Sequence, residues 1–286
     1  MRSQSAGNLF FLQKDTSETL CNEIITSHEN IKNISLHVPK HLKPLNNNQL
    51  GYYLAGLIDG DGDFSSQEQL VIVFDEKSVS VAYFLKKEIG FGHVKKVKNK
   101  KASLFIISKK EGIVKVLNLI NHKIRSDNKL TQIHNLLRKD SYANLNMIFK
   151  KEKKNDLENH WLAGFSDADA SFQIKIVERK MKKEVRLNFQ IDQKKDSLLL
   201  LLIQNYLGGH IGYRKDQDTY YYGSTSFGSA KKVISYFDEY HLLSNKQLNY
   251  LKWRKAYLLI LQKEHLTVKG IEKIVMLKNT MNNKAL

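Results

Sequence analysis

The sequence LAGLIDGDGDF at residues 54–64 is an apolar run of helical length with regularly spaced carboxylates at its C-terminal end. Asp59, Asp61 and Asp63 occupy every second position at its end. The C-terminus of a helix carries partial negative charge and normally attracts Lys or Arg, so acids there repel one another and oppose the helix dipole. The pattern therefore predicts that a cation binds at this point, and carboxylate oxygens are ligands that hard divalent metals prefer.

A second copy of this segment, LAGFSDADASF, stands at residues 162–172, displaced by 108 positions. Further matches recur at a displacement of 117: Asp75 with Asp192, Gly92-His93 with Gly209-His210, and Asn128-Lys129 with Asn245-Lys246. The nine extra residues of the second copy are assigned to a longer hairpin around VERKMKKEV at 177–185. A duplicated domain predicts a pseudo-twofold molecule in which the two acidic helix ends can meet.

The elements that must position these acids follow from hydrophobic periodicity. Residues 48–60 and 156–168 have the pattern of helices, with Asn or Asp available as N-caps. Strands with period-two alternation follow, then a helix near 196–207, a second hairpin, and helices from about 229 to 262. Each copy is therefore predicted to be αββαββα, an α+β fold with a four-stranded antiparallel sheet backed by helices. The predicted boundaries are an N-terminal extension 1–45, a first domain 46–140, a linker 141–155, a second domain 156–262 and a C-terminal tail 263–286.

The composition favours a nucleic-acid partner. The formal net charge is +17 over 286 residues, which suits a polyanion. No apolar run is long enough to span a bilayer, so we expect no membrane association. The single cysteine, Cys21, excludes an internal disulfide framework and a Cys-rich zinc site.

These motifs resemble those of the LAGLIDADG homing endonucleases, in the single-chain form with two motifs. LAGLIDGDG at 54–62 matches the family signature closely and LAGFSDADA at 162–170 more loosely. The resemblance implies a monomer that hydrolyses one phosphodiester bond per DNA strand with water activated by a divalent metal, Mg²⁺. It implies metal binding by Asp61 and Asp169 with the carbonyl oxygens of Gly60 and Ala168. The repeated Asn-Lys pairs nominate Lys129 and Lys246 as the lysines that the family places near each site.

The resemblance also implies that the polar faces of the two sheets form a saddle in the major groove of a long, specific double-stranded DNA site. Amide and basic side chains at alternating positions can read base edges, and a lysine-rich turn at 93–101 can contact phosphates. The predicted DNA-binding residues are Ser66, Gln67, Lys96, Lys98, Lys100, Gln173, Lys175, Arg179, Arg186, Asn188, Gln190 and Arg214.

Other interpretations of the same residues remain. Asp59 and Asp167 are expected to make local hydrogen bonds rather than bind metal, and Asp63 to be a solvated turn residue. An EF-hand loop is excluded because Phe64 and Leu70 stand where it needs Gly and Glu. Ser166 and Ala170 depart from the signature, which predicts slower cleavage of one strand.

Three functions fit the fold: a homing endonuclease that promotes intron mobility, an intron maturase that binds intron RNA as a splicing cofactor, and a non-cleaving DNA-binding regulator. Two intact acids favour the first. The resemblance implies a mitochondrial location.

Overall fold

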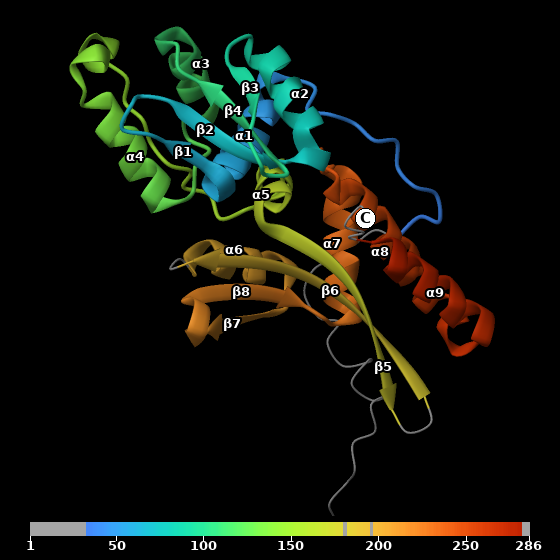
Figure 1. Ribbon diagram of the computed structural model, residues 1–286. Coiled ribbons are helices and arrows are strands. Elements are labelled where there is room, and N and C mark those ends of the chain that lie inside the picture. The colour runs from blue at the N-terminus through green and yellow to red at the C-terminus, as the bar shows by residue number, and fades with distance from the viewer. Residues whose placement is uncertain (1–32, 180–181, 195–196, 282–286) are drawn as a thin grey trace, which may run out of the picture. The chain divides into compact units, whose positions relative to one another are not determined.

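Two copies of one α+β arrangement follow each other along the chain (Figure 1). The computed structural model describes residues 33–179, 182–194 and 197–281. Residues Ile34–Leu286 form one unit and Met1–Asn33 another, and residues 1–32 of the predicted N-terminal extension lie outside the described residues. The α+β fold with two four-stranded antiparallel sheets is confirmed.

The first copy consists of α1 (Asn47–Asp61), β1 (Gly62–Phe64), β2 (Leu70–Asp75), α2 (Val79–Ile89), β3 (His93–Lys96), β4 (Ala102–Ile107), α3 (Lys110–Ile120) and α4 (Asp127–Leu137). The second consists of α5 (Trp161–Asp169), β5 (Ala170–Arg179), β6 (Lys182–Lys194), α6 (Leu198–Leu207), β7 (His210–Arg214), β8 (Thr219–Ser224), α7 (Phe227–Glu239) and α8 (Lys246–Leu261), followed by α9 (Val268–Thr280). The sheets have matching strand orders, β1-β2-β4-β3 and β5-β6-β8-β7.

Local sequence signals account for the element ends. The Asn46 side chain caps α1 by accepting a 2.9 Å hydrogen bond from the Gln49 N–H. Gly92 and Gly209 precede β3 and β7 with φ of 97° and 92°, a left-handed conformation that glycine adopts without strain. The predicted equivalence of these two Gly-His pairs is thereby confirmed as a feature of strand starts.

The helix predicted from residue 156 begins only at Trp161. The Arg125 side chain donates hydrogen bonds of 2.6 Å to the Lys154 carbonyl and 2.7 Å to the Asp156 carbonyl. These carbonyls are therefore engaged by a distant side chain instead of by helical N–H groups. The start of the prediction was wrong because this tertiary contact has no local signal.

The sheet register corrects one predicted equivalence. Gly62 of β1 pairs with Ile72, and its counterpart Ala170 of β5 pairs with Ile191. Ile72 therefore corresponds to Ile191, and Asp75 corresponds to Lys194 rather than to Asp192. The β5–β6 hairpin contains the predicted insertion, and it is two residues longer than the sequence repeat indicated.

Residues beyond the two repeats pack onto the second one. The buried Arg254 of α8 bonds Asp238 of α7 at 2.8 Å and donates to the Ser35 carbonyl at 2.8 Å. Within the C-terminal tail, α9 buries Ile274. Among the described residues, every helix is too short or too polar to cross a membrane.

Candidate active site

Glycines bring helices α1 and α5 into backbone contact. A Cβ atom at Gly56 would lie 1.9 Å from the Trp161 carbonyl oxygen, and one at Gly164 would lie 1.9 Å from the Tyr53 carbonyl oxygen. Only glycine permits this approach at these two positions. Gly51 of the same helix does not take part in this contact, because it faces the Leu119 carbonyl of α3.

The first acid of each motif makes structural hydrogen bonds, but to residues distant in the chain, so the prediction that these bonds are local was wrong. Buried Asp59 accepts from the N–H groups of Arg125 at 2.8 Å and Ser126 at 3.2 Å, and from the Trp161 indole of the other copy at 2.8 Å. In the same way, Asp167 accepts from the Tyr53 hydroxyl at 2.8 Å and from the N–H groups of Leu243 and Ser244. The two acids thus join the copies reciprocally and orient the segments that begin α4 and α8.

Replacing Trp161 with Phe tests this cross-copy bond. We expect the Trp161→Phe variant to lose about 1–3 kcal/mol of unfolding free energy beyond the effect of size, because Asp59 then lacks a buried donor. Trp253→Phe is the matched control: both tryptophans are fully buried, and the Trp253 indole N–H has no partner among the described residues. Equal urea midpoints for the two variants would contradict the assigned role.

The second acid of each motif lies at the helix end. Asp61 ends α1 and Asp169 ends α5, and a Cβ atom at Gly60 would lie 2.9 Å from a carboxylate oxygen of Asp169. Loss of hydration raises the pKa of Asp61, although its side chain keeps solvent access. Burial and the neighbouring Asp61 charge raise the pKa of Asp169 to about 7. The helix contact therefore crowds the two carboxylates electrostatically.

Two lysines compensate this negative charge. Lys129 donates to the Gly62 carbonyl, and Lys246 donates to the carbonyls of Ala168 at 2.6 Å and Ser166 at 3.1 Å. These are carbonyls at or just beyond the ends of the motif helices, where a cation is favourable. Both lysines lower the pKa of Asp61 and of Asp169 through their charge, and burial lowers the pKa of Lys246. The predicted pair thus lies beside the acids, and the Ala168 carbonyl already has a donor.

Sequence reasoning missed Gln193. Its side-chain amide donates to the Asp169 carboxylate. Gln193 of β6 pairs with Tyr220 of β8. Its side chain lies on the same face of the sheet as the buried Ile191, two residues before it. A glutamine at a core-facing strand position was the available signal.

The donor set fits a hard divalent cation. Two crowded carboxylates with raised pKa values stand beside backbone carbonyls, and a phosphate of bound DNA could complete an oxygen coordination shell. Among the described residues, no group of three or more His, Cys, Asp or Glu side chains could hold a metal ion. A metal would therefore depend on the substrate for part of its coordination.

The crowding predicts how stability of the metal-free protein depends on pH. The folded state favours protonated Asp169, so ionisation destabilises it as pH rises from about 4 to about 7. With chelator present, we expect Asp169→Asn to be more stable than the wild type by about 1–3 kcal/mol at pH 8 and by much less at pH 4.5. Urea unfolding at the two pH values measures this difference, and a difference independent of pH would contradict it.

The predicted DNA-binding residues of the second copy share one face of their sheet. Cross-strand pairs Gln173 with Asn188 and Lys175 with Arg186 lie on that face, since opposed residues point the same way. An amide chain crosses it, from Asn188 to Gln190 and from Gln190 to Asp192 at 2.9 Å.

Several of these side chains already have partners. Arg214 is 3.1 Å from Asp192 and Arg186 is 2.7 Å from Glu184. Asn188 is only 4% exposed, so a base could reach it only after Gln173 or Gln190 moves. The Arg179 side chain lies outside the described residues.

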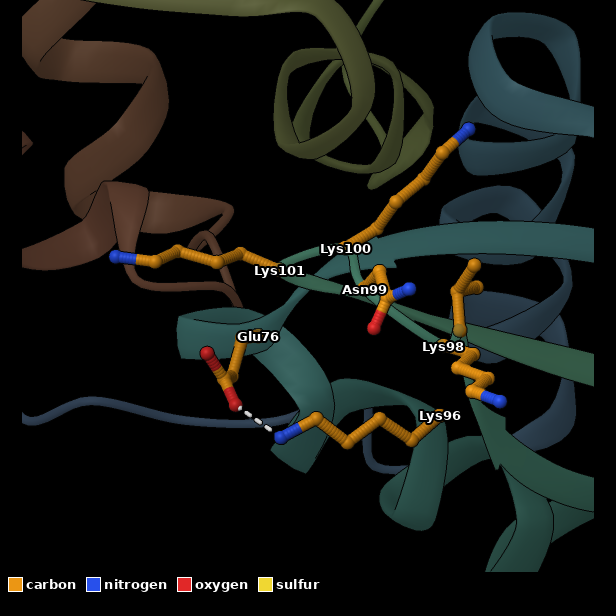
Figure 2. Close-up of a pocket in the computed structure, with 7 residues that line it drawn as sticks. Glu76, Lys96, Lys98, Asn99, Lys100 and Lys101 are labelled. Carbon is orange, nitrogen blue, oxygen red and sulfur yellow. Dashed lines mark hydrogen bonds and ion pairs between the residues drawn. The ribbon is translucent and has the colours of Figure 1, made fainter.

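The predicted contacts of the first copy lie in turns or, for Lys96, at the end of strand β3. Ser66 and Gln67 are exposed between β1 and β2. Lys98 and Lys100 are exposed in the β3–β4 turn around a shallow pocket, and Lys96 pairs with Glu76 at 2.7 Å (Figure 2). In this view the side chains of Lys100 and Lys101 extend in different directions.

Comparison with known proteins adds independent information. The profile of a family described as LAGLIDADG endonuclease matches residues 162–257. An uncharacterized 37.2 kDa protein of cox1 intron 2 from Schizosaccharomyces pombe is 58% identical over 95% of this chain and 83% of its own length. A probable intron-encoded endonuclease of Neurospora crassa is 26% identical over 81% of this chain, which spans 44% of that protein. The intron-encoded RNA maturase bI4 of Saccharomyces cerevisiae is 30% identical over 61% of this chain and 27% of its own length.

Solved structures share the fold. The meganuclease I-SmaMI bound to uncleavable DNA superposes with a TM-score of 0.69 at 23% identity, over 82% of this chain and 99% of that one. The same meganuclease bound to an uncleaved DNA target in the presence of calcium ions superposes with a TM-score of 0.64.

Proposed function

The chain belongs to the LAGLIDADG endonuclease family, and from this premise we propose that it is a site-specific DNA endonuclease that cuts both strands and promotes mobility of its intron. The observation that carries the proposal is the meeting of Asp61 and Asp169 at the ends of two helices in backbone contact. Such crowding of like charges destabilises the metal-free protein and is explained by binding of a cation.

We propose that Asp61 and Asp169 hold Mg²⁺, with the Gly60 carbonyl available as a further ligand. When bound, the metal would supply Lewis-acid activation of water and neutralise charge on the scissile phosphate. Lys129 and Lys246 would steady the phosphates, and Lys246 with a pKa lowered by burial would also exchange protons with water. Gln193 would orient the Asp169 carboxylate through its hydrogen bond.

The remaining context follows as part of the same proposal. The chain would act as a monomer on a long double-stranded site, since both acidic helix ends are present in one molecule. A mitochondrial location is supported by the cox1-intron relative.

A randomised duplex library tests the function directly. We expect the purified protein to cut one sequence on both strands with Mg²⁺ and to leave it intact with chelator. Sequencing the cut ends would also compare the rates of the two strands. Absence of cleavage and of sequence-selective duplex binding under all divalent metals would overturn the proposal.

A maturase is the second candidate, favoured by the similarity to an RNA maturase. It predicts tight, selective binding of an intron transcript that accelerates splicing in vitro. Because binding of an RNA polyanion does not require carboxylates, Asp61→Asn with Asp169→Asn should leave that activity unchanged. The same variants therefore distinguish the two functions.

A further inference from the structure

The two sheets present different chemistry on the faces that their helices leave uncovered. In the first sheet, Val71 of β2 pairs with Ile106 of β4, and Val73 pairs with Leu104. Opposed residues share a face and alternate residues change face, so these four apolar side chains form one patch, named here the apolar patch. The other face, with Leu70, Ile72, Phe105 and Ile107, forms the buried core.

The corresponding positions of the second sheet are polar or small. Gln190 of β6 pairs with Gly223 of β8, and Asp192 pairs with Tyr221. By the β1–β2 and β5–β6 registers, Gln190 and Asp192 are the counterparts of Val71 and Val73. Duplication has thus preserved the surface while its chemistry has diverged.

The apolar patch lies at the surface. Val73 is 46% exposed, and Val71, Leu104 and Ile106 are partly exposed. Exposed His93 and Lys95 of β3 pair with Ile106 and Leu104 and share the face. Exposed aliphatic side chains next to basic ones suit a particular kind of ligand. Such a ligand is a polyanion that also carries apolar groups.

The major groove of DNA provides such a ligand. Its one apolar group is the C5 methyl of thymine, and every base pair with thymine presents it there. Val and Ile side chains are stiff at χ1, so they lose little freedom on contact. The face is also the pseudo-symmetric counterpart of one that carries Gln173, Gln190 and Arg214.

We propose that the apolar patch reads thymine methyl groups, so that the half-site under the first sheet is rich in T·A pairs while the second half-site is read by hydrogen bonds. This inference rests on the proposed DNA-binding function and specifies its substrate. Val71, Val73, Leu104 and Ile106 are then specificity-determining residues.

Deoxyuridine substitution removes the methyl groups and little else. A duplex is first selected by binding in Ca²⁺, so that cleavage is not required. The selection is then repeated with a Gln190→Ala variant. The half-site whose preferred bases change is the one that the second sheet contacts. Each thymine of one half-site is next replaced by deoxyuridine.

Replacement in the first half-site should weaken binding about fourfold for each methyl that contacts the patch, and about tenfold or more in total. The same replacement in the second half-site is the matched control and should change affinity less than twofold. A Val73→Ser variant, which removes both methyl groups at this 46% exposed position, should lose the sensitivity to deoxyuridine at one base pair and remain folded in urea titration.

The outcomes separate the two levels of inference. If no duplex is enriched, the proposed function fails and this inference fails with it. If a duplex is enriched but deoxyuridine costs the same in both half-sites, only the reading of thymine is overturned. Dimerisation that Val73→Lys abolishes would also overturn it, because a second copy would then cover the patch.

Discussion

Asp61→Asn and Asp169→Asn should each reduce double-strand cleavage on the order of 10³-fold or more, and the double variant should be no worse than either single one. Asparagine keeps the shape of aspartate but removes the negative charge that a divalent metal requires. The two carboxylates lie close enough for Asp61 to raise the pKa of Asp169. Residues that act as one unit show such non-additive losses.

Plasmid cleavage under single-turnover conditions measures these losses, with nicked and linear products quantified separately. Binding of the selected duplex should fall far less than cleavage, because the sheets remain intact. Glu272→Gln on α9 is the control for removal of an exposed carboxylate away from the site and should leave the rate unchanged. Multiplicative losses in the double variant would show that the two acids work independently.

Gly56→Ala should destabilise the protein by about 3 kcal/mol or more, and Gly164→Ala should do the same. The new Cβ atom would meet a backbone carbonyl oxygen at 1.9 Å in each case, so the two motif helices must separate. Overpacking of a core normally costs about 1–3 kcal/mol, and a backbone cannot move aside as a side chain can. Separation would also displace Asp61 from Asp169, so cleavage should fall even at temperatures where the variants remain folded.

Gly228→Ala provides the control for this second prediction. Gly228 lies in α7, and a Cβ atom there would contact nothing within 4 Å. Because alanine favours a helix over glycine, this variant should gain up to about 1 kcal/mol. Chemical denaturation of the three variants compares the effects, and a similar gain at Gly56 would refute close packing of the motif helices.

Much of the predicted site could be read from the sequence because duplication made it visible. The repeat located both motifs, and the Asn-Lys pairs led to Lys129 and Lys246, which lie beside the acids. Alternation along β5 and β6 assigned Gln173, Lys175, Arg186 and Gln190 to one face. These features depend on local periodicity, which the order of residues specifies directly.

What the sequence by itself determined is thus the α+β class, the two copies, the family and the side chains that can do chemistry. The tertiary structure alone decided that Trp161 donates a hydrogen bond to Asp59 across the copies and that Gln193 donates one to Asp169. It also decided that Arg125 binds the Asp156 carbonyl, so that α5 begins later than predicted. It also decided that β6 is offset by two residues from the repeat, which makes Gln190 and Asp192 the counterparts of Val71 and Val73. Contacts between distant segments and strand register depend on packing of the whole molecule, and no local pattern encodes them.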